Sequence, residues 1–231
     1  MKIGIIGSST VAQTLGEQLL TVGQAVMISA RDLDAPKDLG ERGVVPAASA
    51  WATTNYDQGR EAAAGSFAEA AAFGELLINA TMGTASLEAL GAADRADIEG
   101  KILIDVSNPL DFSHGFPPGL AFSNYDSLGE RIQAAYPGAR VVKTLNTMNC
   151  AVMVDPSRLG EETDVFVAGN DAAAKAWVTE DVLEGWLGWS LIVDLGDITA
   201  ARGLEMYLPL WIRLLGATGT ALLNVKLVVA R

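Results

Sequence analysis

The sequence contains one cysteine and one histidine among 231 residues, and this scarcity limits the chemistry that the chain can perform. The single cysteine, Cys150, excludes a framework of disulfides and fits a reducing compartment, so we expect a cytoplasmic protein. The sequence has no CxxC pair, no HExxH motif and no acidic cluster at ligand spacing, so we predict no metal site. It also lacks a Walker A motif and a Gly-x-Ser-x-Gly elbow. If the chain is an enzyme, its reactive groups therefore belong to a cofactor.

Basic residues are also few, since 16 Lys and Arg face 28 Asp and Glu and the formal net charge is −12 at pH 7. A nucleic acid or an anionic membrane surface requires a basic footprint, so we expect neither as a partner. Long hydrophobic runs are missing as well, because Pro209 and Arg213 interrupt the most apolar window, Leu204–Leu223. The chain does not open with the basic and apolar segments of a leader, and we expect no export.

The first 32 residues carry the clearest structural signal. A short apolar run, Lys2–Ile6, is followed by a segment with helical spacing, Val11–Leu20, and by a second apolar run, Ala25–Ser29. Strand, turn, helix and strand in this order form a βαβ unit, which starts a parallel sheet with a right-handed crossover. Half of the residues are apolar, so the chain can bury the core of one large domain, with or without a helical extension.

The turn after the first strand is similar to the G-x-G-x-x-G/A pattern of dinucleotide-binding units. Gly7 suits the sharp exit from the strand, and Ala12 is small enough for close packing of helix and strand. Ser9 occupies the middle glycine position, where a serine would either hydrogen-bond a phosphate or crowd it. The amides that open the helix form an anion site with either residue. We therefore predict a nucleotide site at Gly7, Ser8, Ser9, Thr10 and Val11.

The end of the second strand bears on the choice of nucleotide. An acidic residue there selects the 2′-hydroxyl of NAD, whereas a nearby arginine accommodates the 2′-phosphate of NADP. The chain offers Ser29 and Arg31, which favour NADP(H), but the adjacent Asp32 leaves NAD open. Arg31 and Asp32 would otherwise be solvated loop charges.

The rest of the chain alternates between strands and helices, which predicts a doubly wound, mostly parallel α/β sheet. We expect a short helix near Pro36–Arg42 and irregular structure through Arg60. Trp51 and Tyr56 would either cover an edge of the nucleotide site or serve as loop anchors, and we favour the second role. Further strands are predicted at Glu61–Gly65, Glu75–Ala80, Gly100–Val106, Arg140–Thr144, Asp164–Ala168 and Leu191–Asp194. Helices are predicted at Phe67–Phe73, Ala85–Ala93, Leu128–Ala135 and Ala172–Leu183. Residues 1–196 would form this domain, and residues 197–231 a C-terminal helical segment.

That C-terminal segment carries an apolar stripe at helical spacing. The stripe predicts a helix that docks on the sheet, covers the substrate pocket or forms a dimer interface, and these roles are compatible. His114 lies in the expected loop Asp111–Ser127, where its Ser-His-Gly context favours a surface residue over a catalytic one. Tyr207 is a candidate proton donor, although a core aromatic is the simpler interpretation. The stripe consists of Leu204, Leu208, Trp211, Ile212 and Leu215.

Taken together, these segments resemble the family of NADP oxidoreductases that use the deazaflavin coenzyme F(420), which includes the reductase domain of the STEAP metalloreductases. The resemblance covers nearly the whole chain. It rests on KIGIIGSSTVAQTLG, NATMGTASLEAL, GKILIDVSNPLDFS, GARVVKTLNTMN, DVFVAGND and DLGDITAARGLEMYLPLWIRL.

The resemblance implies a Rossmann domain with a small C-terminal helical part, often as a homodimer. NADP(H) would lie along Gly7–Ala12, with its 2′-phosphate near Ser29 and Arg31. A small-molecule second substrate, a deazaflavin or flavin, would stack on the nicotinamide under the C-terminal helix, and direct hydride transfer would need no catalytic acid or base from the protein. The nicotinamide itself would lie near Thr81, Met82, Asn108, Pro109, Asn146, Thr147 and Met148.

Three positions depart from the family pattern and keep other functions open. Ser9 replaces the middle glycine, Ala30 replaces a serine or threonine, and Met82 stands where a proline commonly follows the threonine. One alternative is a repurposed Rossmann protein with altered or lost dinucleotide binding, acting as a ligand-binding or non-redox pathway protein. Another is a reductase of a small carbonyl or imine, against which the few acid or base residues near strand ends argue.

Overall fold

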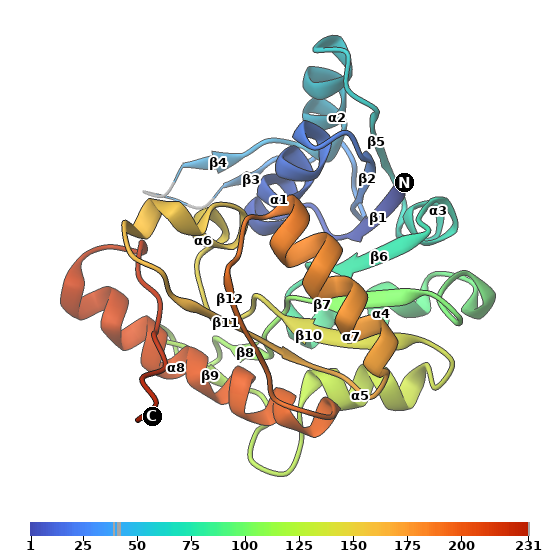
Figure 1. Ribbon diagram of the computed structural model, residues 1–231. Coiled ribbons are helices and arrows are strands. Elements are labelled where there is room, and N and C mark those ends of the chain that lie inside the picture. The colour runs from blue at the N-terminus through green and yellow to red at the C-terminus, as the bar shows by residue number, and fades with distance from the viewer. Residues whose placement is uncertain (39, 41–42, 231) are drawn as a thin grey trace.

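The computed structural model describes residues 1–38, 40 and 43–230, and its centre is an eight-stranded sheet with helices on both faces (Figure 1). The strands lie in the order β12-β11-β10-β7-β6-β1-β2-β5, and every neighbouring pair is parallel except β10 and β11. The expected doubly wound, mostly parallel α/β fold is confirmed. The strands are β1 (Lys2–Ile6), β2 (Ala25–Ser29), β5 (Ala62–Gly65), β6 (Leu76–Asn79), β7 (Ile102–Asp105), β10 (Arg140–Thr144), β11 (Asp164–Ala168) and β12 (Leu191–Asp194).

The order of strands creates a switch point beside β1. The chain builds outward from β1 through β2 and β5, then returns to the other side of β1 with β6. Loops that leave β1 and β6 therefore diverge, and open α/β sheets bind ligands in the crevice between such loops.

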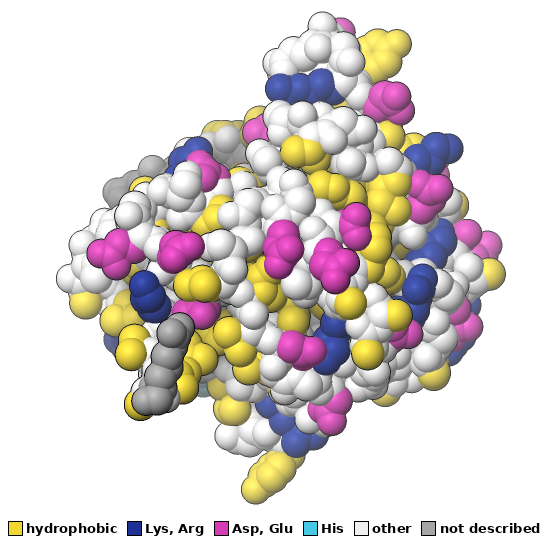
Figure 2. All heavy atoms as spheres, in the orientation of Figure 1, with side chains coloured by type: hydrophobic (Ala, Val, Ile, Leu, Met, Phe, Trp, Pro, Cys, Tyr) yellow, Lys and Arg dark blue, Asp and Glu magenta, His cyan; other side chains and the backbone are white. Residues whose placement is uncertain are grey.

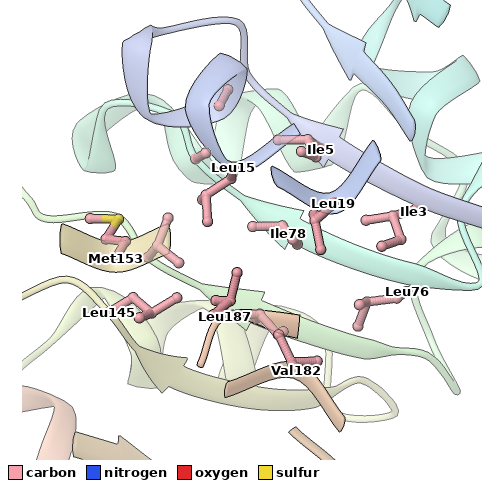
Figure 3. Packing of buried hydrophobic residues seen from close by; sticks show 14 of the residues in the cluster. Ile3, Ile5, Leu15, Leu19, Leu76, Ile78, Leu145, Met153, Val182 and Leu187 are labelled. Carbon is pink, nitrogen blue, oxygen red and sulfur yellow. The ribbon is translucent and has the colours of Figure 1, made fainter. Parts of the chain in front are cut away.

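Alternation along the strands divides the apolar residues between two cores. Ile3 and Ile5 of β1 face one core, whereas Ile6 faces the other. Figure 3 shows Leu15 and Leu19 of helix α1 beside the first core. Helices α1 (Thr10–Thr21), α2 (Ala48–Asp57), α6 (Cys150–Val154) and α7 (Ala172–Trp177) cover this core, and α3 (Phe67–Phe73), α4 (Ser86–Gly91) and α5 (Leu128–Ala135) cover the opposite one.

The last part of the chain is helical but not uniformly so. Helix α7 continues directly as a π-helix, Val178–Trp186, so the expected helix Ala172–Leu183 is three residues longer than predicted. Helix α8 (Ala201–Thr218) runs beside α5 and β9 (Gly119–Leu120), and its apolar stripe is largely buried (Figure 1).

Short 3-10 turns lie at Gly83–Ala85, Arg95–Asp97, Pro156–Leu159 and Ile198–Ala200.

Two local predictions are wrong. A short helix is expected near Pro36–Arg42, but strand β3 (Lys37–Asp38) pairs there with β4 (Val44–Val45). The two valines of β4 are β-branched and favour a strand over a helix. Residues 39 and 41–42 of the expected helix lie outside the described residues. The segment expected to be irregular contains α2, and Trp51 is a buried helix residue rather than a loop anchor. Its ring packs where Gly16 of α1 has no side chain, a contact that the weak periodicity of α2 did not reveal.

A further hairpin interrupts the expected loop Asp111–Ser127, where β8 (Leu110–Asp111) pairs with β9. On the surface, acidic and basic side chains are interspersed over the face shown in Figure 2. Among the described residues, no helix combines the length and the hydrophobicity that crossing a bilayer requires.

Candidate functional site

A cleft of about 460 Å³ opens at the switch point between β1 and β6. Its walls come from the turn after β1, the end of β2, the β3 strand, and the turn and helix that follow β6. The lining includes several of the predicted site residues, namely Gly7, Ser8, Ser9, Ser29, Arg31, Thr81 and Met82, together with Asp32, Lys37 and Glu88.

Gly7 makes the turn that the fingerprint requires. Its φ of +128° lies in a region that favours glycine, and a Cβ there would lie 2.7 Å from the carbonyl oxygen of Ala80. The Gly7 amide donates to Ser29 Oγ at 3.2 Å, and the Ser29 hydroxyl donates to the carbonyl of Ile5 at 2.8 Å. Ser29 is fully buried at the wall of the cleft, and its hydroxyl holds the turn in place.

Ser9, the residue in place of the middle glycine, is the N-cap of α1. Its backbone is extended, with a φ of −71°, so the turn does not require glycine here. The Ser9 hydroxyl donates to the carbonyl of Ala80 at 3.3 Å and accepts from the amide of Ala12 at 3.5 Å. These bonds hold the side chain against the end of β6. Helix geometry leaves the amides of Thr10 and Val11 without intrahelical partners, which keeps an anion-binding end on α1.

Two cations, Arg31 and Lys37, also line the cleft. Arg31 lies 3.7 Å from Glu88, and both side chains are about three-quarters exposed, at 77% and 74%. Lys37 donates to Ser8 Oγ at 3.2 Å. Partial burial lowers the pKa of Lys37, and the neighbouring Arg31 lowers it further, because a second positive charge disfavours the protonated ammonium. A ligand with a doubly charged anionic group would relieve this repulsion.

Lys37 is the residue that sequence reasoning missed. It is the only lysine between Lys2 and Lys101, and it follows Arg31 by six positions, which is a weak signal. The β3–β4 hairpin brings it back to the turn after β1.

The turns predicted to meet the nicotinamide lie on neighbouring strand ends but do not all line the cleft. Thr81 lines the cleft, and its hydroxyl donates to Asn79 Oδ1 at 2.8 Å. Asn108 donates to the carbonyl of Asn146 at 2.8 Å, and the Asn146 amide donates back to Asn108 Oδ1 at 2.9 Å. Gly83 joins the two groups, since its amide donates to the carbonyl of Asn108 at 3.1 Å. The predicted residues that do not line the cleft are Thr10, Val11, Asn108, Pro109, Asn146, Thr147 and Met148.

The turn after β10 contains a strained residue. Leu145 has a φ of +62° although it is a buried leucine, and such a conformation costs on the order of 1–3 kcal/mol. It redirects the chain so that Asn146 meets Asn108. Asn146, Thr147 and Met148 are all buried. The sequence carries no local signal for this strain.

The remaining candidates for acid or base chemistry are weak. His114 is exposed in the loop between β8 and β9, as the surface interpretation predicts. Tyr207 packs with the small apolar cluster of α8, and burial raises the pKa of its hydroxyl, which makes it a poorer acid. In the described ranges, no group of three His, Cys, Asp or Glu side chains could hold a metal ion.

Known proteins resemble this chain in both sequence and fold. Residues 2–109 match the model of a family described as NADP oxidoreductase, coenzyme F(420)-dependent. A candidate F(420)-dependent NADP reductase from Arthrobacter sp. FB24 is 49% identical, with a TM-score of 0.88 and full coverage of both chains. The hypothetical protein SMa0349 from Sinorhizobium meliloti is 25% identical, with a TM-score of 0.63 and 87% of each chain covered.

A metalloreductase is also among the relatives. Metalloreductase STEAP3 of Rattus norvegicus is 26% identical over 214 residues, which are 91% of this chain. The match spans 38% of that protein, so this chain corresponds to well under half of its length.

Proposed function

Because the chain belongs to the family of NADP oxidoreductases that depend on coenzyme F(420), we propose that it exchanges a hydride between NADP(H) and a deazaflavin or flavin. One observation carries the NADP(H) part of the proposal. Arg31 and Lys37 line the same cleft as the Gly7 turn and Ser9, the N-cap of α1. Arg31, which follows β2, and Lys37 of β3 suit a 2′-phosphate, and a helix N-terminus suits a pyrophosphate.

Different residues of the site would hold the two halves of the nucleotide. Arg31 and Lys37 would hold the 2′-phosphate, and the amides at Ser9, Thr10 and Val11 the pyrophosphate. The nicotinamide supplies or accepts the hydride when it is bound, and the protein contributes positioning rather than an acid or base. The turns proposed to surround the ring contain Thr81, Met82, Asn108, Pro109, Asn146, Thr147 and Met148.

Further parts of the proposal concern the second substrate and the assembly. We place the deazaflavin or flavin on the nicotinamide under α8, in a cytoplasmic homodimer. Light scattering on the purified chain measures the assembly, and NADPH oxidation with added flavin or deazaflavin measures the acceptor.

The test of the proposed function is a titration of the pure protein with NADPH and NADH, followed by calorimetry and tryptophan fluorescence. We expect NADPH to bind more tightly than NADH, and Arg31→Ala to weaken NADPH binding about tenfold, because a charge-assisted hydrogen bond contributes about 1.5–3 kcal/mol. NADH binding should change little. If neither nucleotide binds at millimolar concentration, the fingerprint no longer serves dinucleotides and the chain is a repurposed Rossmann protein.

The preference for NADPH should also depend on pH. Lys37 binds a phosphate in its protonated form, and its pKa in the free protein lies below the ordinary 10.5. As pH rises through that lowered pKa, Lys37 loses its proton, so NADPH affinity falls relative to NADH affinity. The matched variant Lys37→Arg keeps its charge. Its ratio of NADPH affinity to NADH affinity should therefore stay constant over the same pH range. An equally steep decline in this variant would exclude Lys37 as its cause.

A further inference from the structure

Lys143 of β10 is fully buried, and oxygen atoms surround its ammonium. Its Nζ lies 2.8 Å from Asp105 Oδ2, 2.9 Å from Glu205 Oε1 and 2.5 Å from the carbonyl oxygen of Ser107. These contacts use all three N–H donors of the ammonium, so Lys143 has none left for a substrate. Its role must therefore be sought in what it holds together.

One part of this charged cluster reaches α8 and α5. Glu205 comes from α8, and its carboxylate also accepts the amides of Leu128 at 2.9 Å and Gly129 at 3.1 Å, at the start of α5. A single carboxylate thus ties two helices to the lysine. The ion pair between Glu205 and Lys143 therefore links α8 to the sheet, in addition to apolar packing.

The other part of the cluster reaches Thr81 by two routes. Asp105 Oδ1 accepts from Asn79 Nδ2 at 2.9 Å, and Asn79 Oδ1 in turn accepts from the Thr81 hydroxyl at 2.8 Å. Ser107, whose carbonyl accepts from Lys143, donates its own hydroxyl to the Thr81 carbonyl at 2.9 Å. Thr81 is therefore held through its side chain and through its backbone, and it lines the cleft.

Lys143 also lies near the end of β10, two residues before Leu145 in the turn that contains Leu145 and Asn146. Asn146 pairs with Asn108, the residue after Ser107. The lysine is therefore bonded to the turn that ends β7, lies on the strand that leads into the turn after β10, and is linked to the turn after β6 through Asp105 and Asn79. A buried ionic cluster of this kind contributes little net stability compared with an apolar replacement, so its use here favours a role in defining geometry.

We propose that Lys143 is a positioning residue, which fixes the three strand-end turns relative to one another and to α8 and so shapes the nicotinamide half of the cofactor site. The inference rests on the proposed NADP(H) function and deepens it. Lys143 does not touch the cofactor. It acts through Asp105, Ser107 and Asn79 on the turn at Thr81.

The test compares two ligands, NADPH and adenosine 2′,5′-bisphosphate, which is the half of NADP without the nicotinamide. In Lys143→Met we expect NADPH to bind about tenfold more weakly, because a small displacement of positioning groups has effects of this size or larger, whereas the fragment binds within about twofold of the wild type. Ser107→Ala, which leaves the charges in place, should lower NADPH affinity about threefold in the same selective way. A general loss of folding would weaken the binding of both ligands to the same extent.

The matched control is Lys175→Met, which removes a largely buried lysine paired with Asp194 away from these turns and should change neither affinity. If Lys143→Met does not fold, Ser107→Ala decides. Amide hydrogen exchange over residues 79–86 of the ligand-free protein should be faster in Ser107→Ala than in the wild type or the control. Unchanged exchange together with an unchanged ratio of the two affinities would overturn the inference. Failure of the wild type to bind either ligand would instead overturn the proposed function, while the exchange still reports whether these contacts hold the turn.

Discussion

Replacing Lys143 with methionine is expected to lower the free energy of unfolding by about 3–5 kcal/mol, a large part of the roughly 5–15 kcal/mol that stabilises a typical domain. The variant leaves Asp105 and Glu205 facing each other without a cation, and both carboxyl groups are almost completely buried. Urea unfolding followed by tryptophan fluorescence measures the loss. Lys175→Met is the control, because its partner Asp194 is 55% exposed and water can replace the lysine, so we expect about 1 kcal/mol.

The loss in Lys143→Met should also grow with pH. Burial raises the pKa of Glu205 most strongly, Lys143 opposes that rise, and the charge of Asp105 adds to it. Burial acts to lower the pKa of Lys143 itself, but the two carboxylates outweigh it and the pKa is raised. Without the ammonium, the pKa of Glu205 in the folded state rises further. An acid whose folded pKa is raised contributes stability at low pH and loses it as pH rises through that pKa.

Two outcomes would contradict this account of the cluster. An unfolding free energy equal to that of the wild type at neutral pH would mean that the carboxylates find other partners. A deficit that shrinks as pH rises would mean that the remaining carboxylates do not repel each other. The double variant Lys143→Met/Glu205→Gln removes one of the two charges and should regain part of the loss.

The second large effect concerns nucleotide selectivity. The double variant Arg31→Ala/Lys37→Met should lose about a hundredfold or more of its affinity for NADPH, because it removes two charge-assisted contacts to the 2′-phosphate. Affinity for NADH should change by less than about threefold, since NADH carries a hydroxyl at that position. Calorimetric titration with both nucleotides measures the change in their ratio.

A control separates local contacts from the general electrostatic field. Arg158→Ala/Lys226→Met changes the net charge by the same amount at positions that do not line the cleft, and it should leave the ratio unaltered. Equal losses for NADPH and NADH in the Arg31 and Lys37 variant would show that these cations do not recognise the 2′-phosphate.

Much of the architecture could be read from the sequence because local periodicity reports local structure. The alternation of Ile3, Ile5 and Ile6 between two cores and the helical spacing of Leu15 and Leu19 are properties of short segments. The segments predicted at Phe67–Phe73, Leu128–Ala135 and Arg140–Thr144 coincide with α3, α5 and β10. Gly7 was identifiable for the same reason, since a turn between strand and helix in a βαβ unit requires it.

Other features of the site depend on which distant segments meet, and no local pattern encodes this. Lys37 reaches the cleft only because β3 and β4 form a hairpin, and Ser29 turns inward because β2 pairs with β1. Lys143 and Asp105 are 38 positions apart and meet because β10 lies beside β7 in the sheet. By itself the sequence determined the class of fold and the glycine turn that leaves β1. Only the tertiary structure decided which buried charges pair and which cations face the cleft, because strand order and hairpin pairing set those distances.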